Sequence, residues 1–280
     1  MSSFLERLGA TNRPRLTATH VDTDWGPLNV FETPGQGHGN LVLVHGLSAD
    51  ASIFSSLLPR LRHRFARIIL PDLLGHGDSH KPLEGLTGDV ANRSLGQALD
   101  QILDAPAMLF GNSLGGYGAI RYASTRPEMV SALAVSSPGG GFLPAADFDA
   151  LMARFKVDSH RDALSLVNDG KSLPLGPLAH LVALRVRRRM NQVSVRAFIE
   201  TLGSHDTLSE SELQGLQMPV LLLWGSHEQL FPRACFEWFR EHLPEHAAVE
   251  EPENFGHAPM SERPRALADR LLAFAETHLG

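Results

Sequence analysis

Short runs of apolar residues recur along the chain, each with Gly, Pro or Asp nearby. They are Leu41–Val44, Ile68–Leu70, Ala107–Phe110, Ala132–Val135 and Val220–Trp224. Because the runs do not alternate with polar residues, they are typical of strands buried on both faces, as in a parallel sheet. Apolar residues at helical spacing predict helices between them, over 52–61, 91–103, 114–124 and 232–242. The alternation of strand and helix indicates an α/β fold.

The part of the chain before these runs has a different pattern. Leu16–Val21 and Leu28–Thr33 have the character of two extended segments joined by a turn near Trp25-Gly26-Pro27. This pattern predicts an antiparallel hairpin that lies along one edge of the sheet.

The alternation stops at Pro138 and resumes only after about Gly215. The stretch between them predicts several helices and few strands. It begins with the flexible sequence Pro138-Gly139-Gly140-Gly141, which apolar side chains follow. We expect a helical lid (residues 138–215) over an apolar pocket, on a core domain formed by residues 1–137 and 216–280. A helical insertion without a part in binding is the alternative.

Composition and charge narrow the classes of function. The net charge of −6 argues against a general affinity for nucleic acids or anionic membrane surfaces. The single cysteine, Cys235, cannot form an internal disulfide, and no Cys/His cluster has the spacing of a zinc site. Met1–Pro14 lacks the apolar core of a signal peptide, and no run approaches the roughly 20 apolar residues that cross a bilayer. We expect a cytoplasmic protein without stable membrane insertion.

The sequence Gly111-Asn112-Ser113-Leu114-Gly115 fits the G-x-S-x-G pattern. It lies between a predicted buried strand and a predicted helix, the context in which a sharp turn exposes a nucleophilic serine. A serine hydroxyl needs a base that takes its proton during attack. Among 14 histidines, His257 stands apart because it follows a short strand-like segment, 247–251, and precedes a final helix from about Pro264. Ser113 and His257 are therefore the candidate nucleophile and base.

Four landmarks in this order resemble the α/β-hydrolase superfamily over nearly the whole chain. They are His45-Gly46, Gly75-His76-Gly77-Asp78-Ser79, the serine turn and Gly256-His257. The resemblance implies an α/β-hydrolase fold, with a mostly parallel central sheet, helices on both faces and a helical lid. It also implies the chain order serine, acid, histidine.

The resemblance implies positions for the remaining site residues. The backbone N–H groups of Leu47 and Leu114 would form the oxyanion hole. The usual acid follows a strand after the lid in a Gly-x-x-Asp loop, and this chain has Glu228 at that position. Alternative acids elsewhere in the sequence are Asp206, Glu251 and Glu253. Gly46, Asn112 and Phe142 are expected at the substrate.

The resulting hypothesis is a serine hydrolase that cleaves small to medium apolar carboxylic esters through an acyl-enzyme, without a metal or organic cofactor. Superfamily members that use an aspartate nucleophile are excluded because Ser113 stands at that position. One alternative is a carbon–carbon bond hydrolase of dienone acids, with a lid arginine such as Arg188 at the substrate carboxylate; Ala258 departs from the tryptophan that is usual there. Another is a ligand-binding member of the fold without turnover. The arginines of 185–189 are interpreted as a solvated helix face, or else as a site for an anionic group. The identity of the substrate and the oligomeric state stay open.

Overall fold

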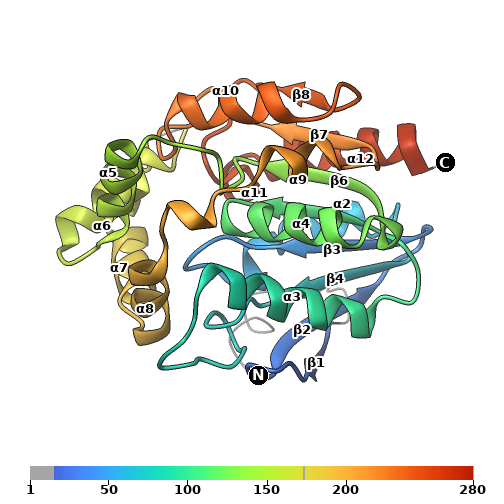
Figure 1. Ribbon diagram of the computed structural model, residues 1–280, viewed down its shortest axis with the longest axis horizontal. Coiled ribbons are helices and arrows are strands. Elements are labelled where there is room, and N and C mark those ends of the chain that lie inside the picture. The colour runs from blue at the N-terminus through green and yellow to red at the C-terminus, as the bar shows by residue number, and fades with distance from the viewer. Residues whose placement is uncertain (1–15, 173, 280) are drawn as a thin grey trace.

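The computed structural model describes residues 16–172 and 174–279. Its centre is an eight-stranded sheet in the order β1-β2-β4-β3-β5-β6-β7-β8 (Figure 1). The strands are β1 Thr17–Val21, β2 Leu28–Pro34, β3 Asn40–Val44, β4 Arg67–Pro71, β5 Ala107–Asn112, β6 Val130–Ser136, β7 Val220–Leu223 and β8 Ala248–Glu250. From β4 to β8 neighbouring strands are parallel, whereas β2 is antiparallel to both β1 and β4. The predicted α/β fold and the edge hairpin are confirmed.

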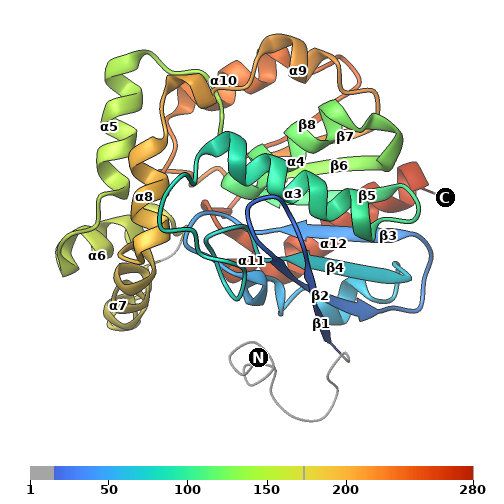
Figure 2. The same cartoon turned by 60° about the horizontal axis from the view of Figure 1, so that its bottom comes forward.

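Helices cover both faces of the sheet (Figures 1 and 2). The first face carries α3 Gly88–Ile102, α4 Leu114–Thr125, α9 Glu210–Gln214 and α10 Arg233–His242. The second face carries the 3-10 turn η1 Ala51–Phe54 and the helices α2 Leu58–Leu61, α11 Pro259–Glu262 and α12 Pro264–Leu279. A further 3-10 turn, η2 Pro127–Met129, leads into β6.

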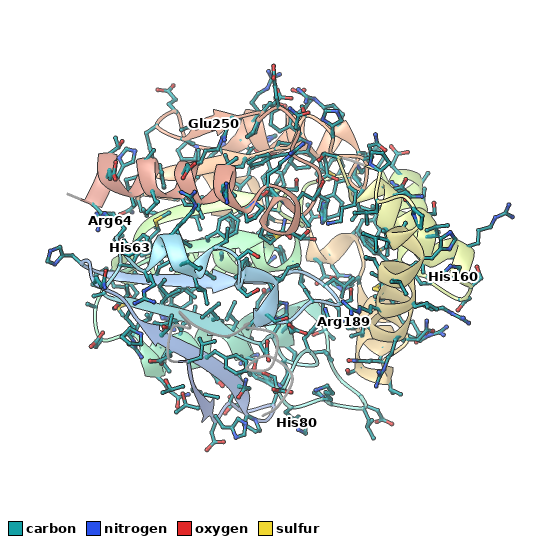
Figure 3. The ribbon with its side chains drawn as sticks, turned by 180° about the vertical axis from the view of Figure 1, so that it is seen from behind. His63, Arg64, His80, His160, Arg189 and Glu250 are labelled. Atoms are coloured by element: carbon teal, nitrogen blue, oxygen red, sulfur yellow. The ribbon has the colours of Figure 1, made fainter. Side chains whose placement is uncertain are left out.

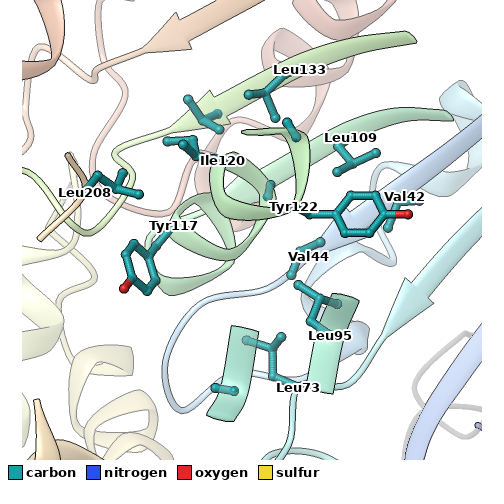
Figure 4. Packing of buried hydrophobic residues seen from close by; sticks show 14 of the residues in the cluster. Val42, Val44, Leu73, Leu95, Leu109, Tyr117, Ile120, Tyr122, Leu133 and Leu208 are labelled. Carbon is teal, nitrogen blue, oxygen red and sulfur yellow. The ribbon is translucent and has the colours of Figure 1, made fainter. Parts of the chain in front are cut away.

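Strand β3 shows why the apolar runs lack alternation. Val42 and Val44 point into the core beneath α3 and α4, while Leu41 and Leu43 point into the core beneath α2 and α12. All four side chains are fully buried. Since successive residues of a strand face opposite sides, a strand covered on both faces must be apolar at every position. Figure 4 shows the packing of the first core.

Between β6 and β7 the chain leaves the sheet and forms a set of helices at one end of the molecule (Figure 2). They are α5 Ala145–Phe155, α6 His160–Asp169, α7 Leu178–Met190 and α8 Val193–Thr201, followed by the turn η3 Ser204–Asp206. Helix α9 packs against α4 and α10 of the core. The helical insertion therefore has the place in the chain that the sequence predicts, and the set α5–α8 is called the lid below.

The segment Met1–Pro14, which we expect not to be a signal peptide, lies outside the described residues. Across residues 16–172 and 174–279, none of the helices combines the length and apolar character needed to span a bilayer.

Candidate active site

Ser113 occupies the sharp turn between β5 and α4, with backbone angles φ 56° and ψ −121°. This positive φ is strained for a serine, and it persists because the surrounding packing leaves the chain no room. A Cβ atom at Gly115 would lie 2.2 Å from the carbonyl oxygen of Val44, and one at Gly111 would lie 2.3 Å from the carbonyl oxygen of Gly115. The glycines on either side of Ser113 thus let α4 start directly against β3 and β5.

His257 and Glu228 form a buried pair. Nδ1 of His257 lies 2.8 Å from Oε2 of Glu228, and the two side chains are 10% and 1% exposed. An ionised carboxylate can only accept hydrogen bonds, so Nδ1 carries the hydrogen and Nε2 presents its lone pair. The ring of Phe231 packs edge-on against the imidazole, with 4.9 Å between the ring centroids. The imidazole is therefore fixed in the tautomer that a general base requires.

The loop after β7 holds Glu228 as an anion. Its Oε1 accepts hydrogen bonds from the backbone N–H groups of Leu230 (2.8 Å) and Phe231 (3.0 Å). Burial by itself would raise the pKa of Glu228, but the charge and hydrogen bond of the neighbouring His257, helped by the N–H of Phe231, outweigh it and hold the pKa below its ordinary value. The carboxylate is accordingly charged at neutral pH.

Asn112 links the serine turn to the histidine loop. Its side-chain amide donates to the carbonyl oxygens of Ser136 (3.0 Å) and His257 (2.8 Å). The amide nitrogen is thus occupied by the protein itself, and the expected contact of Asn112 with substrate stays a prediction. Because Asn112 directly precedes Ser113, these bonds fix the backbone of His257 relative to the serine.

An apolar cavity of about 90 Å³ opens beside Ser113. Leu47 and Leu114 line it, together with lid and core side chains that include Leu143, Phe148, Leu151, Met152, Phe155 and Phe231. Phe142 is absent from this lining and is 54% exposed, so the geometry gives no support to its expected contact with substrate, which stays a prediction. The chain turns at this point such that Gly141 and Leu143 face the cavity while Phe142 faces outward.

Cys235 also lines this cavity. Burial raises the pKa of its thiol to about 12, so the group is protonated and is no rival nucleophile to Ser113.

The loop after β3 brings Leu47 to the serine through a tight turn. The N–H of Ala49 donates to the carbonyl oxygen of Gly46 (3.2 Å), and Ser48 has φ 58°. A Cβ atom at Gly46 would lie 3.1 Å from Cβ of Ser113, so Gly46 allows the turn to approach Ser113 closely. Gly46 thus lies beside Ser113, and its expected contact with substrate stays a prediction.

Two lid arginines, Arg154 and Arg189, bind the loops that carry site residues, a role that the sequence did not predict for either. Arg189 of α7 forms an ion pair with Asp50 and donates to the carbonyl oxygen of Ser48 (3.4 Å). Figure 3 shows Arg189 lying between the lid and the core. Arg154 of α5 donates to the carbonyl oxygens of Gln229 and Leu230, both at 2.9 Å. The lid therefore contacts both the Leu47 loop and the Glu228 loop. Periodicity could not reveal these contacts, because they join segments more than 70 residues apart.

A buried histidine, His45, forms hydrogen bonds with the backbone next to Leu47 and with the loop after β4. His45 is fully buried; its Nδ1 donates to the carbonyl oxygen of Gly46 (2.9 Å), and its Nε2 accepts from the N–H of Leu73 (3.1 Å). Burial lowers the pKa of His45 to about 4 and that of the neighbouring His76 to about 3. Both rings are therefore neutral at pH 7.

The alternative acids are engaged elsewhere. Asp206 accepts a hydrogen bond from the N–H of Gly203 (3.0 Å) and pairs with His205 (3.3 Å), although it also borders the apolar cavity. Glu251 pairs with Arg233, and Glu253 is exposed. The geometry thus favours Glu228 as the partner of His257.

A second, polar cavity of about 500 Å³ lies on the other side of the Leu47 loop, where Ser48, Asp50 and Asp72 line it. Arg185, Arg188 and Arg189 of α7 border it. Arg188 is therefore at this cavity and not in the lining of the apolar one, which removes the basis for its contact with a dienone carboxylate beside Ser113. Within residues 16–172 and 174–279, no cluster of three His, Cys, Asp or Glu side chains is arranged to hold a metal ion.

Comparison with known proteins agrees with this architecture. A model of the alpha/beta hydrolase family matches residues 41–270. A pimeloyl-acyl-carrier-protein methyl ester esterase of Nitrosomonas europaea is 30% identical over 250 residues, which are 84% of this chain and 94% of the relative. The crystal structure of a bacterial membrane phospholipase A is 27% identical, with a TM-score of 0.81 over 95% of this chain and 87% of the other. Carboxylesterase CesB of Bacillus subtilis, at 23% identity, shares the fold with a TM-score of 0.76 over 93% of this chain and 91% of its own. The chain belongs to the alpha/beta hydrolase family.

Proposed function

We propose that the protein is a serine hydrolase that cleaves carboxylic esters through an acyl-enzyme. The observation that carries the proposal is the pair His257–Glu228, 2.8 Å apart, with the backbone of His257 tied by Asn112 to the strained turn at Ser113. A relative whose name specifies a methyl ester esterase supports the choice of an ester bond.

In the proposed reaction the Oγ of Ser113 attacks the ester carbonyl carbon, and Nε2 of His257 takes the hydroxyl proton. The backbone N–H groups of Leu47 and Leu114 donate to the oxyanion that develops. When the tetrahedral intermediate collapses, His257 returns the proton to the departing alcohol. Water, activated by the same imidazole, then attacks the acyl-enzyme and restores Ser113 with release of the carboxylic acid.

Glu228 acts on this reaction through His257. Its charge stabilises the imidazolium that forms in both steps, and its hydrogen bond to Nδ1 keeps Nε2 free to accept a proton. The lowered pKa of Glu228 fits this role, because a protonated carboxyl group carries no charge to stabilise the imidazolium.

The cavity supports a choice of substrate class. Most of its side chains are leucine, methionine and phenylalanine, and about 90 Å³ is well below the roughly 300 Å³ at which pockets for drug-sized ligands begin. We therefore assign apolar esters with a short group in the cavity, and longer groups only when the lid moves.

Hydrolysis of p-nitrophenyl esters of increasing acyl length tests the proposal. We expect turnover that a fluorophosphonate probe abolishes by labelling Ser113, with the highest kcat/KM for short acyl chains. An absence of both labelling and turnover by the folded protein would overturn it. Labelling without turnover of any ester would instead favour the ligand-binding alternative.

A further inference from the structure

Helix α7 presents a mixed apolar and basic face, and the two arginines of this face, Arg185 and Arg188, also border the polar cavity. At about 100° per residue, five of its side chains fall within about 120° of the helix circumference. They are Leu178, Leu181, Leu184, Arg185 and Arg188. The three leucines are 62%, 60% and 54% exposed, whereas Ala183 and Met190, on the opposite side of the helix, are buried. We call these five residues the α7 outer face.

The α7 outer face is positive although the chain as a whole carries a net charge of −6. Helix α7 contains four arginines and no acidic residue. Arg189 is paired with Asp50, and Arg187 donates to the carbonyl oxygen of Asp158. Within the described part of the chain, Arg185 and Arg188 form neither an ion pair nor a hydrogen bond. Two cations therefore stand next to three exposed leucines without a partner.

We propose that the α7 outer face docks the protein onto an anionic lipid surface. The leucines would enter the boundary between headgroups and acyl chains, and Arg185 and Arg188 would contact lipid phosphates. An interfacial helix needs this combination of apolar and basic side chains on adjoining strips. Arginine is suited to it because the aliphatic stem packs on apolar surface while the guanidinium reaches the charged layer.

The distribution of exposed apolar side chains favours lipid over an acidic protein partner. Of the seven large apolar side chains that are exposed in the described residues, five lie in the inserted segment: the three leucines, Phe142 and Val193. An acidic surface accounts for the arginines, whereas the adjoining strip of three exposed leucines on the same helix matches the apolar side of an interfacial helix. The overall negative charge still opposes general adsorption, so contact is confined to this face.

Flotation with vesicles tests the proposal without any turnover of lipid, since the full chain carrying Ser113→Ala is used. Vesicles of phosphatidylglycerol and phosphatidylcholine are compared with vesicles of phosphatidylcholine alone. We expect flotation with the anionic vesicles, weakened by high salt. In that background, Leu181→Ser with Leu184→Ser, and separately Arg185→Gln with Arg188→Gln, should each lower the partition coefficient by about tenfold or more.

Matched controls change the same residue types elsewhere. Leu83→Ser alters a 73% exposed leucine outside the lid, and Arg265→Gln removes an exposed arginine of α12; neither should change flotation. Failure to float with anionic vesicles, or equal losses in the controls, overturns the proposal. A salt-sensitive complex with a purified acidic carrier protein in place of vesicle binding would also overturn it. Because flotation requires no ester cleavage, its outcome is separate from that of the proposed function.

Discussion

Arg189 of the lid and Asp50 of the loop after β3 form an ion pair across the boundary between the lid and the core. Their side chains are 31% and 19% exposed. Asp50 also accepts a hydrogen bond from the N–H of Ser52 at the start of η1. A lid residue therefore fixes the loop whose Leu47 N–H we assign to the oxyanion hole.

Replacing this arginine should affect catalysis more than substrate binding. We expect Arg189→Ala to lower kcat for a short p-nitrophenyl ester between about tenfold and 100-fold, because small displacements of a catalytic donor are costly. KM should change little. Arg189→Lys should restore part of the loss by keeping the charge. Arg188→Ala, on the same helix but without a protein partner, is the control; an equal loss in that variant would contradict the assignment.

Removal of the proposed nucleophile should silence the enzyme. Ser113→Ala is expected to lower ester turnover by about 10⁴ to 10⁶. The unfolding midpoint in urea should stay near that of the parent, since the substitution removes one buried oxygen. Substantial residual activity in the purified variant would mean that another group attacks the ester.

The assignment of the acid rests on the 2.8 Å contact between Glu228 and His257. Glu228→Gln keeps an acceptor for Leu230 and Phe231 but can favour the wrong imidazole tautomer, so kcat should fall by up to about 10⁴. Glu228→Asp should retain more activity than Gln, because it keeps the charge and shortens only the reach.

Neutral substitutions at the rival carboxylates control this experiment. Asp206→Asn, Glu251→Gln and Glu253→Gln should each leave kcat near the parent value. If one of them abolishes turnover while Glu228→Gln remains active, the acid is that other residue.

Acid should destabilise the fold through His45 and His76, whose pKa values burial lowers to about 4 and about 3. Between about pH 6.5 and pH 4 the unfolded chain takes up protons that the folded chain does not, so stability is present above this range and lost as pH falls. The loss is on the order of 3 kcal/mol for each ring. Asp72 opposes it in part, because burial raises its pKa to about 6 and its protonation favours the folded state.

Urea unfolding at a series of pH values measures this effect. His45→Gln supplies a donor and an acceptor without titrating, so it should flatten the pH dependence of the free energy of unfolding. His20→Gln, on the exposed strand β1, is the control. An unchanged slope in His45→Gln would show that the acid sensitivity arises elsewhere.

Widening the apolar cavity should change the choice of substrate. Phe148 of α5 lines the cavity, and Phe148→Ala should move the preferred acyl chain of p-nitrophenyl esters to greater length. The ratio of kcat/KM for hexanoate to that for acetate measures the change. Phe142→Ala, which alters the exposed neighbour on the same segment, should leave the ratio unchanged.

The sequence by itself determined the architecture and indicated two candidate site positions, Ser113 and His257. Runs such as Leu41–Val44 reflect burial on both faces of a strand, and their short length with nearby glycine or proline separates them from buried helices. The glycines around Ser113 are equally local, because the turn into α4 leaves no space for a Cβ atom at Gly111 or Gly115. His257 could be singled out because a loop between the last strand and the final helix has a fixed place in this fold.

Only the tertiary structure decided which groups meet across the chain. Glu228 and His257 are 29 residues apart. Packing of the loops after β7 and β8 brings Glu228 to His257, while Asp206 bonds the N–H of Gly203 instead. Composition likewise could not show that Asn112 binds backbone carbonyls or that Phe142 faces outward. The contacts of Arg154 and Arg189 depend on how the lid rests on the core. A sequence pattern records which face of an element is buried, whereas the partner of a polar side chain is set by the folding of segments that are distant along the chain.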